Sequence, residues 1–535
     1  MSSATASTSG SSAKWLAPLI VLIAGSFLPP MDSAIVNVPI PHIQKDLGGG
    51  ADDVAWISTA YSLGLAVFVP LSNWLSDRFG LTLVHRVSLI GFLIGSGLCG
   101  LAWDLNSLIV FRILTALPGS IVPVVTIAMI YRIVPPEKIG SAMGLYGLGV
   151  IVAPSMGPTL GGLLVQDLSW RWIFLFKEPL GIAAVVAGVF LIPKLGGIGK
   201  PDKFDKWGYL TFAYGLSALI VVSAKGQKWH WDSYTVMILT VSALLSLALF
   251  AVIENEVRNP IIDLRIFRCW PFVNSLLLIC VLLIMLFGVS YYIPQFLQNA
   301  QGLDPHNTGM VLLPLGILMV VAVPVAGRLY DWSGPRWVSL AGMIGSIIGL
   351  SMLARSIGLD MTREQAGIWV MVAMMGGALG FMPIMTNGLS WLPPHLVGYG
   401  GAMNNVMQRT ASALGVAVVG VIVNRSSAQL SADMGAGQTV MDLPKYAKAD
   451  QSTLYGLYSQ TQLRITAIAD GNAFVICSWL AVLAALLVLM LKRPPLRVAA
   501  STPAEPDRPP RPSPDPTAEP SSDEAPASVT ASAPS

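Results

Sequence analysis

Long apolar runs alternate with short polar segments along almost the whole chain. Each run holds about the 20 residues that a helix needs to cross the hydrocarbon core of a bilayer. The pattern predicts fourteen membrane-spanning helices, at 15–38, 54–75, 82–102, 107–131, 139–165, 172–193, 207–224, 234–253, 272–298, 307–330, 337–355, 366–390, 397–423 and 471–491. We therefore expect an all-α integral membrane protein with both chain ends on one side of the membrane, because the number of crossings is even.

The composition supports a lipid environment. Hydrophobic residues make up 54% of the chain and charged residues only 11%, whereas a typical soluble domain has about 25% charged residues. The formal net charge of +3 gives no reason to expect nucleic acid as a partner. The four cysteines stand far apart and no cluster of histidine or nucleophile with a base is evident, so we expect no metal site, no cofactor and no catalytic site.

Lysine and arginine are unevenly distributed between the connections of the predicted helices. Connections on the side of the N-terminus hold 17 of these residues, and those on the other side hold 11, four of them in the segment 424–470. Cytoplasmic connections carry the excess of basic residues in membrane proteins. We expect both termini in the cytoplasm and the chain in the inner membrane of a bacterium.

A short repeat organises the chain. The stretch NWLSDRFG (73–80) has a similar counterpart in GRLYDWSG (327–334). Its residues Leu75, Asp77 and Gly80 recur as Leu329, Asp331 and Gly334. Both copies stand at the inner end of an even-numbered span. We interpret this as two homologous six-helix halves, and parallel repeats with a site between them are a transporter architecture.

The remaining segments complete the expected organisation. It comprises a cytoplasmic N-terminal tail (1–14), a first half (15–193), a linker with two extra helices (194–271), a second half (272–491) with a long outer loop (424–470), and a C-terminal tail (492–535). The C-terminal tail is rich in proline, alanine, serine and acidic residues, and such a composition is typical of disordered segments.

Few charged side chains lie inside the predicted helices: Asp32, Arg112 and Arg409, with Lys177 and Glu178 near a helix end. An ionisable group in hydrocarbon costs at least ~2.5–3.5 kcal/mol, so each should face a cavity or a partner. We expect Lys177 and Glu178 to form a local ion pair at the membrane surface, with Glu178 kept as an alternative proton-coupling carboxylate.

Asp32 and Arg112 are expected to meet. Asp32 stands near the outer end of the first span and Arg112 at a comparable depth in the fourth. A change in substrate binding or water access would then alter the proton occupancy of Asp32. The alternative is that Asp32 caps a helix end or reaches the headgroups, because Pro29 and Pro30 precede it and the helix can break there.

A glycine- and proline-rich stretch, GLYGLGVIVAPSMGPTLGG, fills the fifth predicted span. Its small residues recur at spacings of three and four, which allows close approach of a partner helix, and its prolines bend the helix. The positions that we single out are Gly149, Pro154, Gly157, Pro158, Gly161 and Gly162.

These stretches together resemble the major facilitator superfamily, and within it the fourteen-helix drug:proton antiporters known as multidrug efflux pumps. The resemblance is carried by MDSAIVNVPIP, LSNWLSDRFG, FRILTALPGS, APSMGPTLGG, WRWIFLFKEPLG and YYIPQFLQNAQGLDPHNTGMVLLP. Some positions depart from the family pattern, among them Asn73 in place of glycine, Ala153 in place of glycine, and Lys177 in place of asparagine.

The resemblance implies roles for the motif residues. It implies proton coupling at Asp32 and Arg112, and exchange of substrate against a coupling ion through the glycine-proline motif. It implies a latch between the two halves, whose members would be Asp77, Arg78, Gly80, Arg86, Asp331, Gly334 and Arg336. From the residues themselves, a carboxylate at Asp77 or Asp331 can meet a helix N-terminus or pair with a neighbouring arginine. Candidate cavity residues are Asn37, Tyr291, Tyr292, Gln295, Gln298 and Arg409.

We therefore expect a proton-driven exporter of amphiphilic or cationic drugs and toxic organic compounds that works by alternating access. Its partners would be a small amphiphilic substrate, protons and the lipid bilayer, with a periplasmic adaptor protein as a further candidate. A dedicated exporter of a metabolite, siderophore or fatty acid remains an alternative. A non-transporting sensor or a membrane enzyme is a remote one.

Overall fold

The structure is a computed structural model that describes residues 15–36, 39–196, 204–226, 228–257, 260–299, 301–303, 305–357, 361–437 and 451–493. The expected N-terminal tail (1–14) and all but the first two residues of the expected C-terminal tail (492–535) lie outside these ranges. Within them the elements are helical, which confirms the all-α prediction. All the elements below belong to one unit, which ends at Pro495.

Among the described residues, eleven segments are long and apolar enough to cross a membrane. They are α1 (Leu16–Ile35), α5 (Leu81–Gly100), α6 (Leu105–Ile133), α8 with α9 (Trp172–Leu175 and Glu178–Leu191), α10 (Lys206–Lys225), α11 (Tyr234–Glu256), α12 (Trp270–Asn299), α14 (Pro335–Ser356), α15 (Arg363–Ser390), α16 (Val397–Gly437) and α18 (Gln451–Val488). The pair α3 (Ala51–Phe68) and α4 (Leu71–Phe79) makes a twelfth span, bent by 52°.

Two further helices occupy the remaining predicted spans. They are α7 (Ile139–Asp167) and α13 (Pro305–Ser333), each 29 residues long, which at ~1.5 Å per residue is ample to cross a bilayer. The short elements α2 (Ile40–Leu47), η1 (Pro136–Lys138) and η2 (Leu264–Arg268) lie in connections. Each of the fourteen predicted spans thus coincides with one helix or one broken pair.

Two boundaries differ from the hydropathy pattern. The second span breaks between α3 and α4, where Pro70 lacks the N–H needed to continue the helix. The segment expected as an outer loop (424–470) is largely helical, because α16 continues to Gly437 and α18 begins at Gln451. Hydropathy marks where the apolar run ends, whereas a helix with polar residues can extend beyond it.

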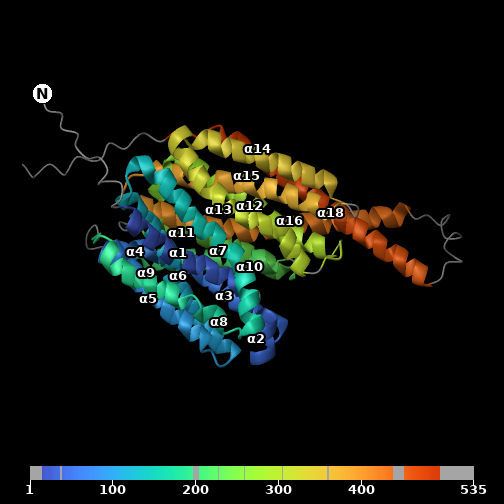
Figure 1. Ribbon diagram of the computed structural model, residues 1–535, viewed down its shortest axis with the longest axis horizontal. Helices are drawn as coiled ribbons and strands as arrows, with labels where there is room; N and C mark the ends of the chain where they lie inside the picture. Colours follow the sequence, from blue (N-terminus) through green and yellow to red (C-terminus); the bar gives the residue numbers. More distant parts are fainter. Residues whose placement is uncertain are drawn as a thin grey trace, which may run out of the picture. The chain divides into compact units, whose positions relative to one another are not determined.

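The packing of the helices repeats between the two halves. α5 packs on α6 as α14 packs on α15, and α1 packs on α7 as α12 packs on α16; Figure 1 shows α14 alongside α15. The two repeated glycines have the same backbone: φ is +87° at Gly80 and +82° at Gly334, in the left-handed region that suits glycine. Each ends one helix and starts the next.

The two interfaces between the halves are built differently. On one side α7 packs directly on α13, and Gly140 and Gly144 bring its backbone against Gly327. On the other side the extra helix α10 packs against both α3 and α16. Its neighbour α11 packs on α10 and exposes large apolar side chains, including Ile238 and Leu245. We infer that α11 faces lipid.

Candidate transport site

A buried cluster of three charged side chains joins α1, α6 and the start of α9. The two carboxylate oxygens of Asp32 have different partners: Oδ2 accepts a hydrogen bond from Nη1 of Arg112, and Oδ1 accepts one from Nζ of Lys177. All three side chains are at most 1% exposed. The cluster therefore holds two cations against one carboxylate, with no access to solvent.

The surroundings of the cluster stabilise its cations. Nε of Arg112 donates to the carbonyl of Ile57 at 3.3 Å, and its Cζ lies 3.8 Å from the centre of the Tyr61 ring. Nζ of Lys177 lies 5.5 Å from the ring centres of Phe92 and Phe174. Aromatic faces attract cations through the ring quadrupole, and the attraction is stronger when water is excluded.

This arrangement brings Asp32 and Arg112 together, as expected, and corrects two details. α1 continues through Pro29 and Pro30 to Ile35, so Asp32 neither ends the helix nor reaches the surface. Lys177 pairs with Asp32 rather than with Glu178, because Lys177, the residue just before α9, is buried against Asp32 of α1, whereas Glu178 is only half-buried. The sequence did mark Lys177 as unusual, because a lysine stands there in place of the asparagine that is usual in the family.

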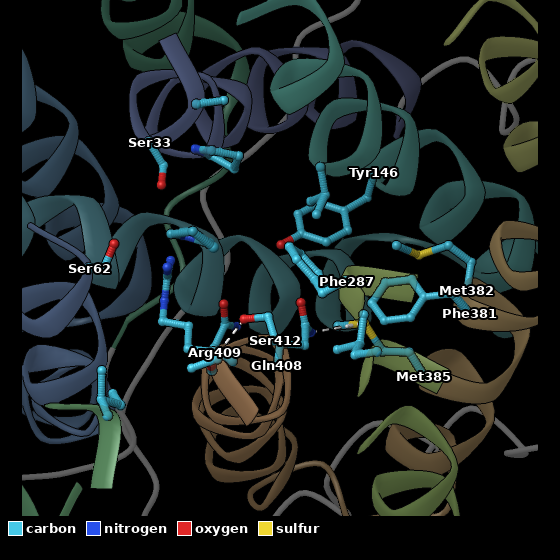
Figure 2. Close-up of a pocket in the computed structure, with 18 residues that line it drawn as sticks. Ser33, Ser62, Tyr146, Phe287, Phe381, Met382, Met385, Gln408, Arg409 and Ser412 are labelled. Atoms are coloured by element: carbon cyan, nitrogen blue, oxygen red, sulfur yellow. Dashed lines mark hydrogen bonds between the residues drawn. The ribbon is translucent and has the colours of Figure 1, made fainter. Parts of the chain in front are cut away.

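Next to the cluster lies a cavity of ≈ 490 Å³ between the two halves. It is lined by Pro30, Ser33, Ala34, Ser62, Pro123, Tyr146, Val150, Ile220, Leu283, Phe287, Phe381, Met382, Met385, Asn405, Gln408, Arg409, Ser412 and Ala413. Figure 2 shows Arg409 on one side with Ser62 and Ser33, and Phe381, Met382 and Met385 on the other. The extra helix α10 contributes Ile220. The cavity is thus polar at one side and apolar at the other.

Of the expected cavity residues, Arg409 lines this cavity. Tyr291, Tyr292, Gln295 and Gln298 do not, because α12 presents Leu283 and Phe287 to it, nearer the middle of the helix. Tyr291 is 47% exposed, and its ring packs against that of Tyr292. Asn37 lies outside the described residues. Sequence reasoning missed Tyr146, Ser33 and Ser62, whose types are common in any helix.

The carboxylate of Asp331 joins the two halves at the end where α1 begins and α18 ends. Its Oδ1 accepts from the backbone N–H of Gly140 at 2.8 Å, and its Oδ2 from that of Ser141 at 2.8 Å and from the Ser141 hydroxyl. Asp331 therefore occupies the N-terminus of α7, where free N–H groups and the helix dipole favour negative charge.

The matching carboxylate, Asp77, has fewer partners. It accepts one hydrogen bond across the halves, from the hydroxyl of Tyr399 near the start of α16, at 3.3 Å. A further contact at this end is made by Tyr131, whose hydroxyl donates to the carbonyl of Thr386 at 3.0 Å. These contacts join the two halves at this end of the cavity.

The arginines of the expected latch do not pair with these carboxylates. Arg86 donates to the carbonyls of Gly188 and Val189 at the end of α9, at 3.0 and 3.2 Å. The guanidinium of Arg78 lies over the ring of Trp74, and Arg336 is exposed. The partners of the two carboxylates are instead the N-terminus of α7 for Asp331 and the hydroxyl of Tyr399 for Asp77.

The glycine-proline stretch lies in α7, and two of its small residues pack against α1. A side chain at Gly157 would lie 2.8 Å from Cβ of Ala34, and one at Gly149 would lie 3.4 Å from Ile23. At Gly162 there is open space. Gly161 belongs to the same helix, as do Pro154 and Pro158, whose side chains are outside the described part.

Two six-helix bundles around a shared cavity, with charged groups buried beside it, define a membrane transporter of the alternating-access type. The chain belongs to the Major Facilitator Superfamily, whose family model matches residues 22–416. This confirms the resemblance seen in the motifs. It also identifies the chain as a multi-pass membrane transporter rather than an enzyme.

Relatives and solved structures agree with this assignment. The chain is 29% identical to the tetracenomycin C resistance and export protein of Streptomyces glaucescens, over 76% of this chain and 75% of that protein. It is 28% identical to a multidrug resistance protein B homolog of Mycobacterium tuberculosis, over 75% of each. The proton:xylose symporter XylE has the same fold, with a TM-score of 0.58 at 13% identity, over 90% of this chain and 97% of that one.

Proposed function

We propose that this protein is a proton-coupled exporter of amphiphilic drugs and toxic organic compounds. The observation that carries the proposal is the buried cluster of Asp32, Arg112 and Lys177 beside a cavity that is polar on one side and apolar on the other. The printed names of the relatives, which describe resistance and export, support the direction of transport and the class of cargo.

Proton occupancy of Asp32 is linked to conformation by electrostatics. In the closed arrangement Asp32 supplies the negative charge for two buried cations. Protonation of Asp32 would leave both cations in a dry site without a counter-charge, and an uncompensated buried charge is strongly destabilising. The protonated state therefore favours a conformation in which water or substrate reaches the cluster, so that proton uptake and opening go together.

The latch gives the second element of the cycle. Asp331 and Asp77 hold the two halves together at one end of the cavity. By the lysine and arginine distribution this end faces the cytoplasm, so the described state is closed inward. Release of Asp331 from the N-terminus of α7 would let the halves rock and open the cavity to the cytoplasm.

The proposal also covers the membrane location, the driving force and a partner protein. The protein would lie in the inner membrane with both termini in the cytoplasm, and the proton gradient would drive it without any cofactor. A periplasmic adaptor protein is a candidate partner for carrying the exported compound further.

The experiment is transport in proteoliposomes with an imposed pH gradient. Wild-type protein should accumulate a fluorescent amphiphile against its gradient, and Asp32→Asn should lose this accumulation while eluting as folded protein in gel filtration. Asp232→Asn, in which the carboxylate is exposed, is the matched control and should transport normally. Unaltered accumulation by Asp32→Asn would remove Asp32 as the coupling group.

A further inference from the structure

Arg409 is a cation in the cavity wall for which the described part of the chain supplies no counter-charge. The eighteen lining residues include no aspartate or glutamate. Nε of Arg409 is buried and has no hydrogen-bond partner among the described residues. The side chain extends from α16 toward the side of the cavity where Ser62 and Ser33 lie (Figure 2).

The carboxylate of Asp32 does not fill this role. Its neighbours Pro30, Ser33 and Ala34 line the cavity, but both oxygens of Asp32 are engaged by Arg112 and Lys177. Asp32 therefore has no oxygen left for Arg409. A cation that is shielded from water and lacks a counter-charge is costly unless a ligand pairs with it.

The rest of the cavity favours an amphiphilic ligand of a defined polarity. Hydroxyl and amide groups of Ser33, Ser62 and Gln408 belong to the lining, and apolar surface comes from Phe287, Phe381 and other side chains. A guanidinium offers a fork of N–H donors that matches a carboxylate, and such charge-assisted pairs are about twice as strong as neutral ones.

We propose that Arg409 binds the acidic group of the substrate, and that the cavity selects amphiphilic organic monoanions over the cations that the sequence led us to expect. The apolar body of such a molecule lies against Phe287, Phe381 and Met382, and its carboxylate or phenolate pairs with Arg409. This inference rests on the proposed export function, because it names the substrate class of the same cavity.

The test is binding of two probes with the same apolar body and opposite charge. Purified full-length protein in detergent is titrated with pyrenebutyrate and with a pyrenebutyl-trimethylammonium salt, and pyrene fluorescence reports binding. Wild-type protein should bind the anion at least about tenfold more tightly than the cation, as expected for a desolvated charge-assisted pair. Arg409→Gln should lose this preference, and Arg409→Lys, which keeps the charge, should retain a part of it.

Arg355→Gln is the matched control, since Arg355 lies at the end of α14 and outside the cavity lining; its preference should equal that of the wild type. A normal gel-filtration profile and retained anion binding by Arg409→Lys would exclude misfolding as the cause of a lost preference. Tighter or equal binding of the cation, binding of neither probe, or an unchanged preference in Arg409→Gln would overturn the inference.

Transport of both probes under a pH gradient separates the two proposals. If the gradient drives export of the cation rather than the anion, the export function stands and the assignment of Arg409 falls. If the anion binds through Arg409 but the gradient moves neither probe, the binding site stands and proton-coupled export falls.

Discussion

The first half (15–193) and the second half (272–491) share one pattern of helix packing but hold their buried charges differently. In the first half Arg112 is paired, stacked on Tyr61 and bonded to a backbone carbonyl. In the second half Arg409 lines the cavity, where its buried Nε has no hydrogen-bond partner among the described residues and no carboxylate belongs to the lining. The repeated packing places the helices, whereas single side chains decide how the buried charge of each half is paired.

At the latch it is the second half that holds the charged side chain with more hydrogen-bond partners. Asp331 of the second half receives two backbone N–H groups and a hydroxyl, whereas Asp77 of the first half receives one hydroxyl. α7 meets α13 directly, whereas at the other interface α16 contacts both the inserted helix α10 and first-half helices, α6 among them. The two interfaces therefore differ in composition.

The largest expected difference is in protein stability, between variants in which one or the other of the two arginines is replaced. Arg112→Met removes a partner of Asp32 and should lower the free energy of unfolding by about 3 kcal/mol, as when other buried pairs are broken. Arg409→Met removes a cation for which the cavity lining supplies no carboxylate, and it should leave stability unchanged or raise it. Thermal unfolding of both variants, followed by tryptophan fluorescence, checks this. Equal losses would show that the two sites do not differ.

Next comes the pair of latch carboxylates. Asp331→Asn removes the charge that three donors share and should cost the closed state about 1.5–3 kcal/mol, whereas Asp77→Asn loses one hydrogen bond worth ~0.5–1.5 kcal/mol. Accessibility of a cysteine introduced at the closed end, measured by alkylation, should rise more in Asp331→Asn. Similar alkylation in both variants would contradict the unequal latch.

The close interface between α7 and α13 should also be sensitive to added volume. A side chain at Gly144 would lie 3.0 Å from the Cα of Gly327, whereas at Gly162 there is open space. Gly144→Val should therefore cost about 1–3 kcal/mol through overpacking, and Gly162→Val, on the same helix, should cost much less. The melting temperatures of the two variants give the comparison, and a reversed order would show that α7 packs in another way.

The smallest effect is expected from Tyr399→Phe. This change removes the hydroxyl that Asp77 accepts and keeps the ring, so the cost should be at most about 1 kcal/mol. Alkylation at the closed end should rise only slightly. A rise as large as that of Asp331→Asn would mean that the Asp77 contact, and not Asp331, holds the halves together.

Much of this architecture was open to prediction from the sequence. Apolar runs of span length gave the helices, and the repeat of Asp77 and Gly80 at Asp331 and Gly334 gave the two halves, because both signals are local. The pairing of Asp32 with Arg112 followed from the cost of burying charge and the comparable depth of the two residues.

Other features could not be predicted because they depend on orientation. A hydropathy pattern does not say which way Lys177 points at the start of α9, so its contact with Asp32 was missed. It also does not say which turn of α12 faces the cavity, so the expected Tyr291 lies outside the lining and Phe287, which sequence reasoning did not single out, belongs to it. The partner of Asp331 depends on where α7 begins relative to α13, which only the packed structure gives.

The central claim is that Asp32 exchanges a proton when substrate binds. The most direct measurement is proton exchange by purified protein in weakly buffered detergent, followed with a pH-sensitive dye as pyrenebutyrate or its cationic analogue is added. We predict proton uptake by the wild type when the anionic probe binds, because added negative charge beside the cluster favours protonation of Asp32, and no uptake by Asp32→Asn at the same occupancy. Equal uptake by both proteins, or none by the wild type, would contradict the account.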